Sequence, residues 1–132
     1  NSAAVKRFDE FADVTGSGVY LRNKTIPLDD IGVQNELKVA QAVRNMGDPI
    51  RELQVKIPGV EGPIDVVSQG RAIEVKTSPN NGNLKDWKGQ VVRLVNYAKA
   101  NGLQAEYWFE NPIRGDRLDF LIQTGVRPVK IP

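Results

Sequence analysis

The sequence contains neither histidine nor cysteine in its 132 residues. The absence of these residues excludes Ser-His-Asp and Cys-His nucleophilic sites, histidine-pair ribonuclease chemistry, and zinc sites of the usual Cys/His type. It also excludes a disulfide framework, so the fold must hold without covalent cross-links. Any enzymatic site in this chain must therefore use carboxylates, lysine, arginine, tyrosine, serine or threonine.

Long hydrophobic runs are missing too. No apolar stretch approaches the roughly 20 residues that a membrane span requires, so we expect none. The chain begins at Asn1 with no basic-then-apolar leader, and we interpret it as a piece of a longer protein. Its composition, with 40% hydrophobic and 26% charged residues, is typical of a folded protein with one core. The net charge of +2 is compatible with nucleic-acid binding but does not indicate it.

The hydrophobic pattern predicts a loosely organised arm over residues 1–25, with a short helix in AAVKRFDEFA, followed by one domain over 26–132. Within the domain it predicts helices over 28–47, 85–100 and 116–125, strands over 51–57, 64–67, 72–76 and 104–109, and an edge strand over 126–131. This order of elements indicates an α/β (α+β) domain, in which a central mixed sheet is flanked by helices.

The stretch GPIDVVSQGRAIEVKT predicts a hairpin with charged residues among its apolar ones. In a hairpin with a symmetric turn at Gln69-Gly70, each residue lies opposite the residue whose number brings the sum to 139. Asp65 therefore lies opposite Glu74. Lys76 lies two residues beyond Glu74, and therefore on the same face. Opposed like charges destabilise a hairpin, so a bridging cation would explain the pair. The alternative is an ordinary solvated strand face.

Glu36 adds a third carboxylate. It lies within the apolar stripe of the predicted helix, so packing of that stripe on the sheet carries Glu36 inward. An unpaired buried carboxylate costs several kcal/mol, so Glu36 needs a partner. Together with Asp65, Glu74 and Lys76 it forms a cluster of charge −2, which a hard divalent ion such as Mg²⁺ would neutralise.

Asp-x8-Glu-x-Lys with an upstream helical glutamate resembles the PD-(D/E)XK nuclease superfamily, whose core is the restriction-endonuclease-like fold. The resemblance implies that Asp65 and Glu74 bind the metal and that Glu36 assists. It implies that Lys76 orients or deprotonates the attacking water and steadies the phosphate. One departure is Ile64, which stands where the superfamily name has proline; Pro63 lies one place earlier.

The later segments GQVVRLVNYAKANG, AEYWFENP and TGVRPVKI are similar to toxin domains at the C-termini of bacterial polymorphic and contact-dependent growth inhibition proteins. That similarity implies cargo of a larger secreted or cell-surface carrier. Such cargo acts in the cytoplasm of a target bacterium, and a dedicated immunity protein protects the producer.

The segment 84–103 carries four basic residues against one carboxylate. A basic helix beside the acidic cluster would bind phosphates without reading sequence, although a solvated helix face is the plain alternative. The predicted nucleic-acid-binding residues are Lys85, Lys88, Gln90, Arg93 and Thr77.

The sequence thus predicts a magnesium-dependent endonuclease. We favour tRNA as its substrate, because so small a domain has little room for the clamps that long duplexes need. A DNase of the same fold is one alternative, and a non-catalytic module that binds nucleic acid or protein is the other.

Overall fold

The computed structural model describes residues 31–60 and 62–132. The predicted arm over 1–25 and its short helix lie outside these residues. The helices are α2 (Ile31–Asn45), α3 (Leu84–Asn101) and α4 (Gly115–Gln123), and the strands are β1 (Ile50–Val55), β2 (Ile64–Ser68), β3 (Arg71–Lys76), β4 (Gln104–Phe109) and β5 (Arg127–Lys130). The described elements follow the order that the sequence predicts, and no end is shifted by more than three residues.

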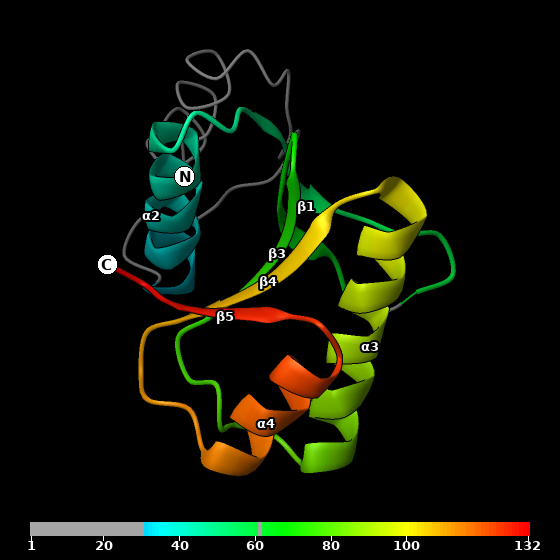
Figure 1. Cartoon of the computed structure of the whole chain (residues 1–132). Coiled ribbons are helices and arrows are strands. Elements are labelled where there is room, and N and C mark those ends of the chain that lie inside the picture. Colours follow the sequence, from blue (N-terminus) through cyan, green and yellow to red (C-terminus); the bar gives the residue numbers. More distant parts are fainter. Residues whose placement is uncertain (1–30, 61) are drawn as a thin grey trace.

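One mixed sheet joins the five strands in the order β1-β2-β3-β4-β5 (Figure 1). The pairs β1–β2 and β2–β3 are antiparallel, whereas β3–β4 and β4–β5 are parallel. The predicted fold class, a central mixed sheet flanked by helices, is therefore confirmed. The edge position predicted for the last strand is also confirmed. At the edge, Pro128 does not interrupt the hydrogen bonding of a central strand.

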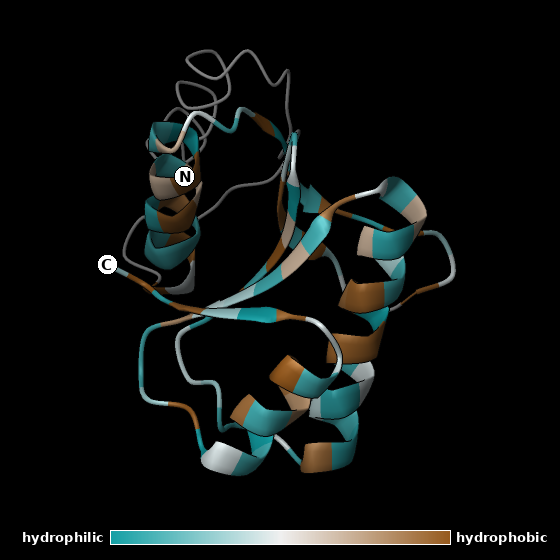
Figure 2. Cartoon of the chain, in the orientation of Figure 1, coloured by the Kyte–Doolittle hydropathy of each residue, from teal (hydrophilic) through white to brown (hydrophobic). Residues whose placement is uncertain are grey.

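Helices cover both faces of the sheet. Helix α2 lies on one face, while α3 and α4 lie on the other (Figure 1). Brown hydrophobic positions of these helices gather toward the strands, and teal positions gather away from them (Figure 2). Val39 and Val43 of α2 are fully buried against one face, and Val91 and Leu94 of α3 are buried against the other. Two apolar layers therefore hold the sheet between them.

The β2–β3 hairpin has the predicted register. Val66 pairs with Ile73 and Val67 pairs with Ala72, so both pairs sum to 139. Strand β1 ends earlier than predicted, at Val55 rather than at residue 57. The reason is that Val55 pairs with Ile64, the first residue of β2, which leaves no strand partner beyond it.

The ends of α3 follow from local chemistry. The Asn83 side chain caps the helix by accepting a hydrogen bond from the Asp86 amide at 2.8 Å. Gly102 ends it with a left-handed φ of 66°, a conformation that glycine adopts without steric penalty. The fixed start of α3 places the first turn of the helix beside the segment that follows β3.

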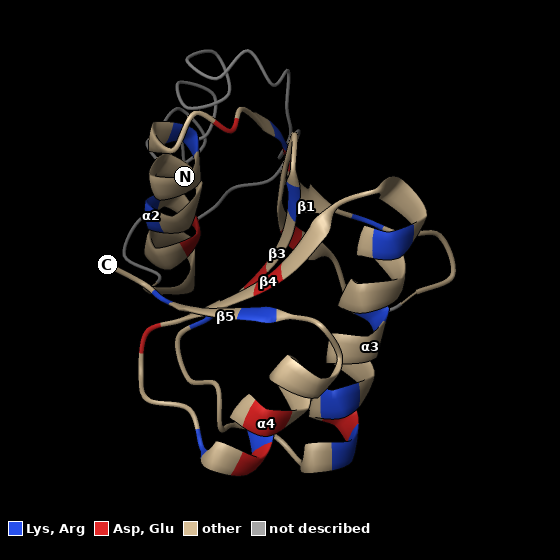
Figure 3. Ribbon diagram, viewed as in Figure 1, with Lys and Arg blue, Asp and Glu red and all other residues tan. Residues whose placement is uncertain are grey.

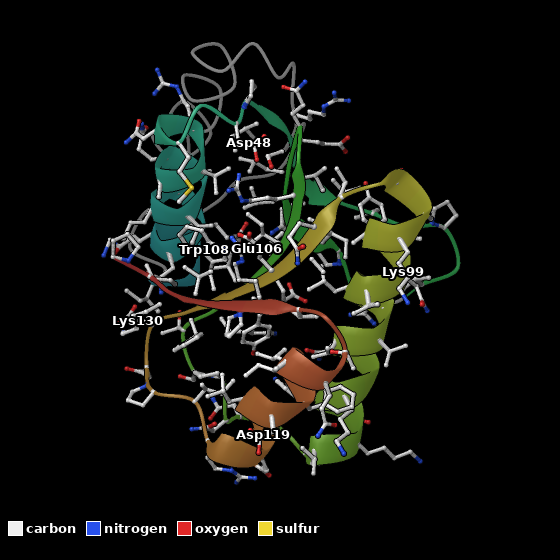
Figure 4. All side chains as sticks on the ribbon, in the orientation of Figure 1. Asp48, Lys99, Glu106, Trp108, Asp119 and Lys130 are labelled. Atoms are coloured by element: carbon white, nitrogen blue, oxygen red, sulfur yellow. The ribbon has the colours of Figure 1, made fainter. Side chains whose placement is uncertain are left out.

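The sheet also contains a buried carboxylate that accepts hydrogen bonds from neighbouring side chains. Glu106 of β4 is 2% exposed and accepts hydrogen bonds from the Trp108 indole at 2.9 Å and from the Arg71 guanidinium at 3.1 Å. Arg71 also pairs with Asp48, which the Ser68 hydroxyl contacts. Glu106 and Trp108 lie between the sheet and α2 (Figure 4). This network ties the hairpin to β4. An Arg127 guanidinium nitrogen lies 3.9 Å from Glu106, so two guanidinium groups match the two carboxylates.

No helix in the part of the chain that the structure describes is long and apolar enough to cross a membrane.

Truncation of Leu94 tests the layer under α3. Leu94 is 1% exposed, so Leu94→Ala should lower the free energy of unfolding by about 2–5 kcal/mol through lost burial and a cavity. Chemical denaturation measures this change. Val92→Ala on the same helix, at a side chain that is 44% exposed, should change the free energy by less than about 0.5 kcal/mol. Equal losses in the two variants would contradict the layer assignment.

Candidate active site

Three polar residues lie in one row across the antiparallel part of the sheet. Gln54 of β1 falls opposite Asp65 of β2, because its neighbours pair as Leu53 with Val66 and Val55 with Ile64. Continuing the β2–β3 register places Glu74 on the other side of Asp65. The opposition of Asp65 and Glu74 that the turn predicts is therefore present in the fold. Figure 3 shows the acidic positions within β3 and β4.

The Asp65 side chain acts as a hydrogen-bond acceptor for the main chain of the neighbouring strand. Its Oδ2 accepts a hydrogen bond from the Val75 amide at 2.9 Å, and its Oδ1 accepts one from the Gln54 Nε2 at 3.1 Å. Hydrogen bonds on both oxygens fix the orientation of the carboxylate. The strands thus hold Asp65 rigidly, although it is only half-buried.

Glu74 is the most perturbed acid of the site. Its side chain is 7% exposed. Burial raises the pKa of Glu74 well above its usual value, and the charge of Asp65 and a hydrogen bond with it add to the rise. The charges of Lys76 and Arg93 lower the pKa and offset part of this effect. Without a cation, Glu74 therefore keeps its proton to a higher pH than an ordinary glutamate does.

Gln54 links the third acid to this pair. Its Nε2 donates to the Glu36 Oε1 at 2.6 Å as well as to Asp65, so one amide joins helix α2 to strand β2. Gln54 is the one described non-glycine residue with positive φ, at 55°. A strained backbone of this kind costs about 1–3 kcal/mol and is typical of functional sites. The sequence analysis missed Gln54, because nothing in a strand-like run marks a left-handed glutamine.

Within residues 31–60 and 62–132, no group of three or more acidic, histidine or cysteine side chains is arranged to hold a metal ion. The Gln54 amide stands between Glu36 and Asp65, so a neutral donor bridges these two acids. Asp65 and Glu74 remain in contact as a pair. Mg²⁺ is often bound by one or two carboxylates, with water and substrate phosphates completing its shell. The pair fits such an ion.

Lys76, Thr77 and Gln90 of the predicted site line one cleft beside the acidic pair. Lys76 ends β3 and is two residues from Glu74. Within the described part of the chain, the Lys76 main chain accepts a hydrogen bond from the Glu110 amide, but neither the Lys76 ammonium nor the Gln90 side chain has a hydrogen-bond or ion-pair partner. Their polar groups are therefore available to a ligand in the cleft.

The basic residues of α3 do not form one surface. Lys85 is exposed, and the Lys88 ammonium lies 4.9 Å from the centre of the Phe120 ring. Arg93 is half-buried, and its guanidinium packs close to Gly62 in the loop before β2. Because the charge of Arg93 acts on Glu74, this residue belongs to the acidic site. Lys85 and Lys88 lie at the surface of the helix, where a ligand could contact them.

Asn35 is a second residue that the sequence analysis missed. It is fully buried on α2, and its Nδ2 donates to the Thr77 Oγ1 at 2.8 Å and to the Glu110 Oε1 at 2.7 Å. Asn35 thereby fixes the segments that follow β3 and β4. The neighbouring Glu36 can be recognised in the sequence because it is an acidic residue within an apolar stripe. An asparagine in a helix gives no such indication that it is buried.

Comparisons of the chain with protein-family models, with curated proteins and with solved structures found no match.

The perturbed glutamate predicts a pH dependence of stability in the absence of metal. Because the folded state raises the pKa of Glu74 above 4.5, its stabilising contribution is complete below that pH and is lost as pH rises through the folded value. Glu74→Gln keeps the shape and removes the titration. At neutral pH in EDTA we expect the variant to be more stable than the parent by up to about 1 kcal/mol.

Thermal unfolding from acidic to alkaline pH measures this difference. The gap between parent and variant should widen as pH rises. Asp119→Asn, at an exposed carboxylate of α4 (Figure 4), serves as the control and should follow the parent. A constant gap at every pH would show that Glu74 is not the titrating group.

Proposed function

We propose that this domain is a metal-dependent endonuclease that hydrolyses phosphodiester bonds in RNA, with tRNA of a target bacterium as the preferred substrate. The observation that carries the proposal is the contact between Asp65 and Glu74 on adjacent strands, with Lys76 on the same strand as Glu74 and lining a polar cleft. This arrangement supports the interpretation made from the Asp-x8-Glu-x-Lys spacing.

The energetics favour a functional reason for the contact. A buried carboxylate is normally compensated by a cation or by several donors. Glu106 has such partners in Arg71 and Trp108, whereas Glu74 is set against another carboxylate. Selection for stability alone would replace one member of the Asp65–Glu74 pair. Selection for cation binding would keep both.

Each residue of the site has a separate role in the proposed reaction. Asp65 and Glu74 would hold a divalent cation such as Mg²⁺, which when bound acidifies water and offsets charge on a phosphate. Lys76 lies in the cleft, where its ammonium orients the attacking water and stabilises negative charge on the phosphate. Gln54 keeps Asp65 and Glu36 in fixed orientations. Through this amide, Glu36 would brace Asp65 from α2 without touching the ion.

The wider role rests on the resemblance to bacterial toxin domains. As cargo of a larger secreted or cell-surface carrier, the domain would act in the cytoplasm of the target cell. The producing cell would need an immunity protein. An acidic protein covering the cleft would neutralise Lys76 and exclude substrate.

Removal of Asp65 tests the enzyme assignment. Asp65→Ala should abolish cutting, because it removes a ligand of the ion and leaves Glu74 without its partner. Purified protein is incubated with labelled tRNA, total RNA and plasmid DNA, with Mg²⁺ or with EDTA, and the products are resolved on gels. The parent should cut RNA in Mg²⁺ only.

Asp119→Ala removes an exposed carboxylate and is the matched control, which should cut like the parent. Circular dichroism should show Asp65→Ala folded. Cutting of plasmid alone would assign the domain as a DNase. If the parent cuts nothing in Mg²⁺, Mn²⁺ or any other divalent metal, the enzyme proposal fails and a binding module takes its place.

A further inference from the structure

A polar cleft of about 480 Å³ opens beside Lys76. Its walls are the segment after β3, with Thr77 and Ser78, and the start of α3, with Asp86 and Gln90, and the first residues of α2 also line it. Trp87 and Tyr107 close its base and are almost fully buried. The volume is in the range of pockets that hold one small ligand, and a double helix would not enter it.

The inner end of the cleft is rich in hydrogen-bond donors. The Thr77 Oγ1 accepts from Asn35 at 2.8 Å, and the Tyr107 hydroxyl accepts from the Trp87 indole at 3.0 Å. A hydroxyl that accepts from a neighbour keeps its own hydrogen to donate. Burial raises the pKa of Tyr107 to about 12, so its phenol keeps that hydrogen at neutral pH. With the Lys76 ammonium beside them, these groups match the oxygens of a phosphate.

The outer end of the cleft offers different chemistry. Asn80 and Asn83 of the loop are engaged, since Asn80 binds the main chain near Pro112 and Arg114 and Asn83 caps α3. The side chains of Ser78 and Asn81, which line the cleft, form no hydrogen bond with any described residue. Asp86 adds an exposed carboxylate at the rim, whose Oδ2 accepts a hydrogen bond from the Asn83 Nδ2 at 2.9 Å. Donors and acceptors are therefore both present where a base edge would lie.

We infer that this cleft binds one unstacked nucleotide of a single strand, with its phosphate toward Lys76 and Thr77 and its base toward Asn81 and Asp86. The inference deepens the proposed nuclease function and rests on it for the position of the scissile bond. Proteins that recognise RNA commonly bind unpaired nucleotides in loops, whose bases can be turned out into such pockets. An unpaired loop fits the cleft, whereas a continuous duplex does not.

The test measures binding separately from cutting. The full chain in EDTA is titrated with a fluorescein-labelled single-stranded RNA oligonucleotide, with its duplex and with single-stranded DNA of the same sequence, all at one salt concentration. The parent should bind the RNA single strand more tightly than the duplex. Ser78→Ala combined with Asn81→Ala should weaken single-strand binding about tenfold through lost hydrogen bonds and leave duplex binding unchanged.

Asn96→Ala on the exposed part of α3, outside the cleft, is the matched control and should bind like the parent. Equal binding of the DNA single strand would support a nucleotide cleft that ignores the sugar. Unchanged binding by the double variant, or an equal loss with the duplex, would overturn the cleft while the nuclease assignment stands. Cleft-dependent binding without cutting in any divalent metal would support the cleft and remove the nuclease function.

Discussion

The contact between Asp65 and Glu74 is the constraint on which the proposed site depends. It exists because the β2–β3 turn sets a register in which opposed residue numbers sum to 139. A slip of one residue would turn either side chain to the opposite face. The β1–β2 register sets Gln54 opposite Asp65, and the parallel pairing of β3 with β4 sets Tyr107 beside Glu74. One line of polar groups thus crosses four strands.

Strand β3 lies between the antiparallel and the parallel halves of the mixed sheet, and this position brings the acidic pair and the cleft together. On its antiparallel side it meets β2 and the acidic pair, and on its parallel side it meets β4. Its end leads through Lys76 into the segment that forms the cleft with α3. The acids and the cleft are therefore neighbours through the geometry of a single strand.

Two buried glutamates have opposite electrostatic surroundings in this fold. Glu106 accepts from Trp108 and Arg71, so its charge is compensated and supports the hairpin. Glu74 contacts Asp65, and the charges of Lys76 and Arg93 oppose the resulting rise in its pKa. The first arrangement stabilises the empty protein. The second leaves an electrostatic demand that a bound cation would satisfy.

The order of the described elements, the mixed sheet and the opposition of Asp65 and Glu74 were predictable from sequence, because apolar periodicity and turn chemistry are local. Tertiary structure alone decided the rest. Gln54 acquired its role through a left-handed backbone, Asn35 through contacts 42 and 75 residues away, and Arg93 through packing under a loop. Such contacts join residues that are distant along the chain, so no local pattern encodes them.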